Sequence, residues 1–150
     1  TLASLLTLPA LRRGDRACRQ QCAELMAFVG CGQYLNHHAS AMPYGALKRL
    51  EIARALASEP DILLLDEPAA GLNRTETDAL REVIRKIADK GVTVVLVEHD
   101  MKLVMSISDQ VLVLCYGRQL ANGTPDQIRA NPHVIEAYLG SRKPEEEALA

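Results

Sequence analysis

The sequence of 150 residues lacks several features that would each assign it to a class of protein. No apolar run approaches the roughly 20 residues of a membrane-spanning helix, so we expect any membrane contact to be peripheral. The formal net charge is only −2 at pH 7, which gives no general electrostatic reason to expect nucleic-acid binding. The four cysteines form no Cys-x-x-Cys pair and no zinc-ribbon spacing, so they are typical of free thiols in the reducing cytoplasm.

Two apolar runs, by contrast, each end in polar residues. Residues 62–65 are aliphatic and lead directly into Asp66, Glu67 and Pro68, while residues 92–97 lead into Glu98, His99 and Asp100. An unbroken apolar run suits a parallel strand covered on both faces, and such a strand offers ligands at its carboxyl end. Because side chains alternate along a strand, Asp66 and Glu67 are predicted to point different ways, one toward a metal and one toward a water. A hydrolase that acts on a phosphate needs one group to bind the metal and another to position the water.

Apolar periodicity predicts helices over residues 16–29, after Asp15 as a cap, and over residues 45–58. Residues 1–13 are interpreted as a short helix or loop, and residues 31–44 as a loop with exposed His37 and His38. Cys18 and Cys22 fall on the apolar stripe of the first helix, so we interpret them as core residues and not as metal ligands.

A further helix is predicted after Asn73, because Asn73 and Glu76 form a cap-and-return pattern and an apolar stripe follows them. The stripe consists of Leu80, Val83, Ile84 and Ile87. A short helix over residues 101–108, a strand over 110–115, a hairpin strand over 119–121 and two short helices up to Gly140 complete the chain. Alternating strands and helices predict an α/β fold with a parallel sheet. We therefore expect a helical subdomain over residues 1–58, an α/β part over 59–140, and a frayed tail over 141–150.

Four segments in this order resemble the ABC-type ATPase family. They are Met42-Pro43-Tyr44-Gly45 opening a helix, residues 62–68, residues 69–73, and His99-Asp100. The resemblance extends over residues 1–140. It implies a partial P-loop NTPase fold, with a helical subdomain followed by the C-terminal part of a mainly parallel sheet.

The resemblance also implies roles for the acids and the histidine. Asp66 would be the Walker B acid that holds Mg²⁺ through a water molecule, since a small hard cation prefers carboxylate and water oxygens. Glu67 would be the catalytic acid that orients and polarises the attacking water. His99 would contact the γ-phosphate of ATP. The plainer alternatives are that Asp66 and Glu67 are solvated acids after a core strand, and that His99 is a packed histidine.

Two further segments match parts that bind the nucleotide in this family. Pro43, Tyr44 and Gly45 stand at the signature motif, where the amino end of a helix would receive a phosphate of the partner subunit's ATP. Gly71 and Asn73 match the D-loop, although both also fit an ordinary turn. The basic residues Lys48, Arg49 and Arg54 are interpreted as a solvated helix face and not as a nucleic-acid site.

Departures from the common family pattern point to one branch of the family. Pro43 stands where many members have serine, and Ala46 where glutamine is common. The segments 43–45, 69–73, 122–125 and 134–140 resemble the ATP-binding subunit of branched-chain amino acid importers, and related amide or urea importers share much of this pattern. Such a subunit would pair with a second one and drive membrane permease subunits from the cytoplasmic face of the membrane.

No phosphate loop of the pattern Gly-x-x-x-x-Gly-Lys-Ser/Thr occurs in the sequence, and the chain starts at Thr1 without methionine. We therefore expect it to be the C-terminal portion of a subunit and inactive alone. A non-catalytic module that lends its signature segment to a partner is a second hypothesis. A soluble ABC ATPase of DNA repair or translation is a third, and a metal phosphoesterase using Asp66, His99 and Asp100 is a fourth.

Overall fold

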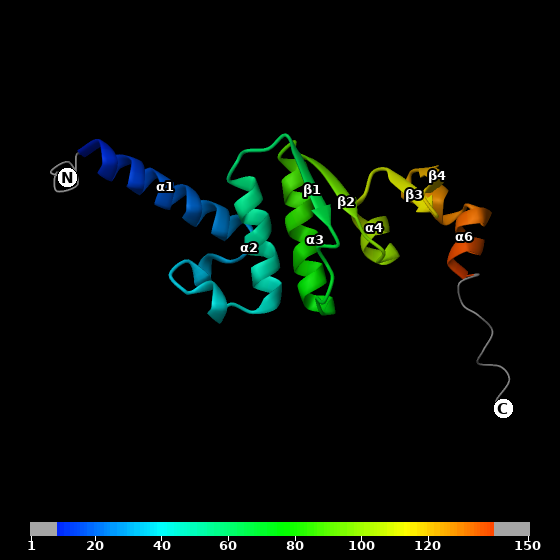
Figure 1. The fold of residues 1–150 in the computed structure, drawn as a ribbon, viewed down its shortest axis with the longest axis horizontal. Helices are drawn as coiled ribbons and strands as arrows, with labels where there is room; N and C mark the ends of the chain where they lie inside the picture. Colours follow the sequence, from blue (N-terminus) through cyan, green and yellow to red (C-terminus); the bar gives the residue numbers. More distant parts are fainter. Residues whose placement is uncertain (1–8, 140–150) are drawn as a thin grey trace, which may run out of the picture. The chain divides into compact units, whose positions relative to one another are not determined.

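The computed structural model describes residues 9–139, drawn in colour in Figure 1. The chain divides into two compact units, one up to Val97 and one from Glu98. The expectations for residues 1–8 and for the frayed tail lie outside the described residues. The boundary expected at residue 58, between a helical and an α/β part, stays a prediction.

Helix α1 (Pro9–Phe28) starts earlier than predicted, so Asp15 lies inside it and pairs with Arg19 at 3.8 Å. The prediction that Cys18 and Cys22 belong to the core is wrong, because both are exposed. Among the residues of α1 whose burial is described, only Met26 in the last turn is buried, and Val29, just after the helix, is buried as well. Amphipathic spacing alone does not bury a residue, since burial also needs a partner element alongside it.

The loop after α1 contains two short 3₁₀ helices, η2 (Gly32–Tyr34) and η3 (Ala39–Ala41), and leads into α2 (Tyr44–Leu56). His37 and His38 are exposed there, as expected. The Nε atom of Arg49 donates a hydrogen bond to the Val29 carbonyl at 3.0 Å, which fastens α2 to the end of α1. Arg49 therefore has a structural role that the interpretation as a solvated face did not include.

Strands β1 (Ile62–Asp66) and β2 (Thr93–Val97) pair in parallel, with Ile62 opposite Thr93 and Asp66 opposite Val97. Helix α3 (Arg74–Asp89) connects them, which confirms the predicted strand–helix–strand order. The predicted cap is also confirmed: Asn73 Oδ1 accepts from the Glu76 N–H at 3.0 Å, and Glu76 Oε2 accepts from the Asn73 N–H at 3.0 Å. The whole predicted stripe of α3 is buried, consisting of Leu80, Val83, Ile84 and Ile87.

One face of the β1–β2 pair is buried and the other is open. Leu63 and Leu65 are 4% and 9% exposed, whereas Leu64 is 73% exposed. The other apolar residues of the open face are Ile62, Val95 and Val97. Within residues 9–139, the prediction that β1 is covered on both faces is therefore wrong. Helix α3 packs against β2, and no described element of the first unit covers the opposite face.

The second unit consists of α4 (Met101–Ile107), β3 (Val111–Cys115), β4 (Arg118–Gly123), α5 (Pro125–Arg129) and α6 (Pro132–Leu139). Strand β3 pairs with β4 in an antiparallel hairpin with an irregularity at Val113, so the predicted hairpin is confirmed. In the described residues β3 is not added to the parallel pair. A small core of Val111, Ala121, Ile128 and Val134 holds this unit together. Among residues 9–139, no helix has both the length and the apolar composition needed to cross a membrane.

Candidate functional site

Asp66 is the last residue of β1 and is exposed. Alternation along the strand places it on the same face as Leu64, at the carboxyl end of the open face. Its carboxylate therefore stands at the strand end where ligands bind in parallel sheets.

Glu67 continues the strand ladder by one hydrogen bond and then turns the chain. Its N–H donates to the Val97 carbonyl at 2.9 Å, but its φ is +43°, which is left-handed backbone. A residue other than glycine adopts this conformation at a cost of about 1–2 kcal/mol, so the surrounding contacts must hold it there. Strand alternation ends at Asp66, and the direction of the Glu67 side chain is therefore set by this turn and not by the pleat.

The turn after the acid pair returns the chain into α3. The Ala70 N–H donates to the Glu67 carbonyl at 3.1 Å, and the Leu72 N–H donates to the Ala69 carbonyl at 3.1 Å. Gly71 has a φ of +77°, a conformation that glycine adopts without steric cost. Asn73 then caps α3, so Gly71 and Asn73 both have a structural reason for their position beside any functional one.

The first N–H groups at the start of α2 have no hydrogen-bond partner within the helix. Pro43 is the residue before the helix and has no N–H, and the Pro43 carbonyl accepts from Ala46 and Leu47, each at 3.0 Å. The N–H groups of Tyr44 and Gly45 precede these bonds, as the first N–H groups of any helix do. Gly45 is buried, and Tyr44 is 51% exposed.

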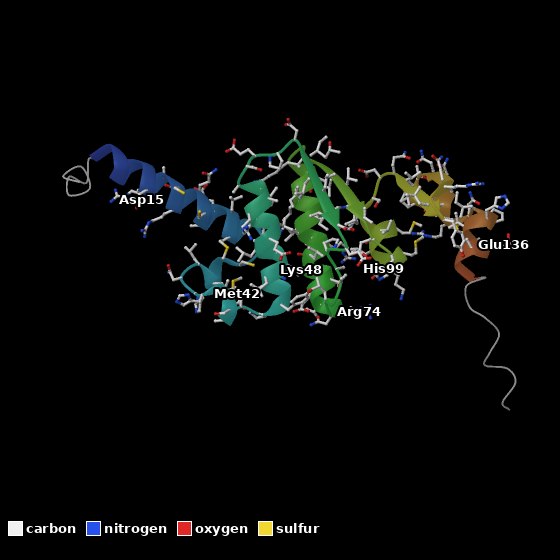
Figure 2. The ribbon with its side chains drawn as sticks, viewed as in Figure 1. Asp15, Met42, Lys48, Arg74, His99 and Glu136 are labelled. Carbon is white, nitrogen blue, oxygen red and sulfur yellow. The ribbon has the colours of Figure 1, made fainter. Side chains whose placement is uncertain are left out.

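The first unit brings the α2 start, the acid pair and the turn together. The Tyr44 hydroxyl donates to the Ala70 carbonyl at 3.4 Å, and Gly45 packs on the Glu76 side chain. In Figure 1, α2 and α3 start at the same end of this unit, and the β1 arrow points toward that end. Met42, just before α2, and Arg74, the first residue of α3, both lie at that end in Figure 2.

His99 belongs to the second unit, so its grouping with Asp66 and Glu67 stays a prediction. Its side chain is 77% exposed. The Glu98 side chain beside it is only 1% exposed, and Glu98 Oε2 accepts from the N–H groups of His99 at 3.1 Å and Asp100 at 3.4 Å. Asp100 caps α4 by accepting from Lys102 and Leu103. The sequence analysis named Glu98 as a polar residue at the end of a strand but gave it no role, although a carboxylate directly before His99 and Asp100 was an available signal.

The described residues offer few protein ligands for a metal ion at any one place. Within residues 9–139, no group of at least three His, Cys, Asp or Glu side chains is arranged to hold a metal. Asp66 as a lone ligand suits Mg²⁺, which is usually held by one or two carboxylates together with waters and substrate phosphates. It does not suit Zn²⁺, which needs three or four protein ligands. The phosphoesterase hypothesis stays a hypothesis, because Asp66 belongs to the first unit whereas His99 and Asp100 belong to the second.

Comparison with known proteins places this arrangement in a family. A family model described as "ABC transporter" matches residues 4–70, and one described as "Branched-chain amino acid ATP-binding cassette transporter" matches residues 118–144. A high-affinity branched-chain amino acid transport ATP-binding protein of Pseudomonas aeruginosa, BraF, is 51% identical over 140 residues. The chain belongs to the ABC transporter family. The family resemblance expected from the sequence is thereby confirmed.

The match to individual ABC proteins covers most of this chain but only part of theirs. The alignment to BraF covers 93% of this chain and 55% of that protein. LivG of Escherichia coli, which has the same description, is 48% identical over 92% of this chain and 54% of its own length. The chain thus spans about half the length of the curated relatives that it matches.

A solved ABC structure shows the same fold. The ADP conformation of MJ1267, an ATP-binding cassette of an ABC transporter, superimposes with a TM-score of 0.74 at 25% identity, over 81% of this chain and 49% of that one. The predicted partial ABC ATPase fold is confirmed. The roles of the individual ABC site residues stay predictions.

Proposed function

We propose that this chain is part of the ATP-hydrolysing subunit of an importer for branched-chain amino acids. The observation that carries the proposal is the meeting of three segments in one unit: the start of α2, the Asp66–Glu67 pair, and the turn that leads into α3. The relatives' descriptions as branched-chain amino acid transport ATP-binding proteins support the choice of substrate.

The two acids divide the chemistry of hydrolysis. Asp66 would hold Mg²⁺ through a water molecule, and the ion would neutralise charge on the ATP phosphates. Glu67 would orient the attacking water and accept its proton, a role that contributes about 10²–10⁴-fold in rate. His99 would contact the γ-phosphate from the turn after β2. The left-handed backbone of Glu67 supports its role, because strained residues held in place by their surroundings cluster at active sites.

The start of α2 would bind the ATP that a second ABC subunit holds. The N–H groups of Tyr44 and Gly45 and the helix dipole favour an anion at this helix end. Pro43 offers no side-chain hydroxyl, so phosphate contacts here would come from the backbone. Gly71 and Asn73, in the neighbouring turn, would face the same partner subunit. The intact assembly would lie on the cytoplasmic face of the membrane, bound to permease subunits.

A chimera tests this function. The chain replaces the region that it matches in BraF, and the chimera is assembled with the membrane subunits of that transporter in lipid vesicles. We expect MgATP-dependent leucine uptake and ATP hydrolysis, and a loss of hydrolysis of at least about 10²-fold in Glu67→Gln. Glu59→Gln is the matched control, since Glu59 is another exposed acid with positive φ, outside the proposed site.

The outcomes separate the hypotheses. A chimera that assembles but neither hydrolyses ATP nor transports leucine contradicts the proposal. Hydrolysis that is unchanged in Glu67→Gln supports the non-catalytic module instead, because the chain would then contribute only its α2 start to a partner.

A further inference from the structure

Several contacts join the start of α2 to the turn after the acid pair. The proposed roles in ATP binding and hydrolysis do not account for these contacts. Four residues form this junction, and we call them the α2 anchor: Tyr44, Gly45, Ala70 and Glu76. All four belong to the first unit.

Gly45 lies against the Glu76 side chain so closely that no other residue fits without a shift. A Cβ atom on Gly45 would lie 2.6 Å from Glu76 Oε1, 2.7 Å from Cδ and 2.8 Å from Cγ. Glu76 cannot easily turn away, because its Oε2 atom accepts the Asn73 N–H in the cap of α3. Gly45, a buried residue in the first turn of α2, is therefore packed on a side chain that the cap of α3 holds in place.

Tyr44 makes the second contact. Its hydroxyl donates to the Ala70 carbonyl at 3.4 Å, and its Cε1 atom would lie 3.2 Å from a Cβ on Gly71. The Lys48 ammonium lies 5.8 Å from the centre of the Tyr44 ring, within the range of a cation–π interaction. The Ala70 N–H in turn donates to the Glu67 carbonyl, so a single residue separates the Tyr44 hydrogen bond from the backbone of the proposed catalytic acid.

We propose that Tyr44 and Glu76 are positioning residues, which fix the start of α2 relative to Glu67 and to the Ala69–Asn73 turn of the same chain. This inference rests on the proposed function and deepens it. In that function Glu67 acts on the ATP of its own subunit, while the start of α2 binds the ATP of the partner. The α2 anchor therefore fixes the start of α2 relative to Glu67, although the two act on different ATP molecules. A displacement of about 1 Å in such a group can cost about 10²-fold in rate.

The chain offers a matched control for the glycine contact. A Cβ on Gly123 would lie 2.5 Å from Gln127 Oε1, and Gln127 holds the cap of α5 as Glu76 holds the cap of α3. Gly45→Ala and Gly123→Ala thus impose the same local clash, but only the first lies in the α2 anchor. For the hydroxyl, Tyr116→Phe is the control for Tyr44→Phe, because Tyr116 is 102% exposed.

The experiment measures kcat and KM for MgATP hydrolysis by the chimera described above. We expect kcat/KM to fall about 10-fold or more in Gly45→Ala and about two- to fourfold in Tyr44→Phe, because one long hydrogen bond is a weaker constraint. Gly123→Ala and Tyr116→Phe should stay within about twofold of the unmodified chimera.

The decisive variant is Gly45→Ala combined with Glu76→Ala. Removing the Glu76 side chain gives the new methyl group room, so adding Gly45→Ala to Glu76→Ala should lower kcat/KM by less than about twofold. If Gly45→Ala is equally harmful with and without Glu76, the methyl group acts directly on nucleotide and the inference is wrong. Equal effects of Gly45→Ala and Gly123→Ala would also overturn it, since the loss would then be a general folding effect. An unmodified chimera without any ATP hydrolysis refutes the proposed function itself.

Discussion

Replacing Leu63 and Leu64 by alanine, one at a time, tests which face of the β1–β2 pair is packed. The two leucines are neighbours on one strand with the same side chain, but Leu63 is 4% exposed and Leu64 is 73% exposed. Any difference between the two variants therefore reports the environment of each face and not the chemistry of the substitution.

The expected magnitudes follow from burial. Leu63→Ala removes a nearly fully buried side chain and leaves a cavity, which costs about 2–5 kcal/mol in the free energy of unfolding. Leu64 keeps only about a quarter of its surface buried, so its alanine variant should lose about a quarter of the 1.5–3 kcal/mol that full burial contributes, or about 0.4–0.8 kcal/mol.

Urea denaturation of the 150-residue chain, followed by circular dichroism, measures both values. In the chimera with BraF, we expect the cost of Leu64→Ala to rise toward that of Leu63→Ala, because both faces of a parallel sheet are normally covered in α/β proteins. Equal costs for the two variants in the 150-residue chain would refute the observation that only one face is packed.

The remaining predictions concern the caps, the buried acid and the activity of the chain alone. Asn73→Ala removes the cap of α3 and should lower the free energy of unfolding by about 1 kcal/mol, whereas Asn36→Ala, in the loop before η3, should change it by less than about 0.5 kcal/mol in the same urea titration. Glu98→Ala leaves the N–H groups of the following turn without their acceptor and should cost about 1–3 kcal/mol, while Glu98→Gln, which keeps an acceptor oxygen, should cost less; equal losses in thermal unfolding would contradict this role. The purified 150-residue chain should show no MgATP hydrolysis, because no lysine-bearing loop is present to hold the phosphates; Mg-dependent activity that Glu67→Gln abolishes would show that this expectation is wrong.

The sequence alone determined the elements whose signals are local. Asn73 and Glu76 lie three residues apart at the start of α3, and both hydrogen bonds of that cap depend only on this spacing. The apolar stripe of α3 repeats at helical period and is buried throughout. The order of four segments along the chain, 42–45, 62–68, 69–73 and 99–100, likewise indicated the ABC family.

Which apolar faces are covered depends on the packing of one element against another. Cys18 has the spacing of a core residue and is exposed, and Leu64 stands in an unbroken apolar run and is 73% exposed. Periodicity states which side chains share a face, but burial depends on whether another element packs there. Similarly, the contact of Gly45 with Glu76 joins residues far apart in the sequence, and no local pattern predicts it.

At Asp66 and Glu67, the local sequence and the tertiary structure each determine part of the geometry. The sequence determined that Asp66 and Glu67 end a strand, because an aliphatic run and a proline bracket them. The structure decided that Glu67 leaves the strand in a left-handed conformation, bound to Val97 on one side and to Ala70 on the other. That conformation is held by hydrogen bonds to a neighbouring strand and to a turn. It is therefore a property of the folded chain, and the intrinsic preference of the residue alone would oppose it.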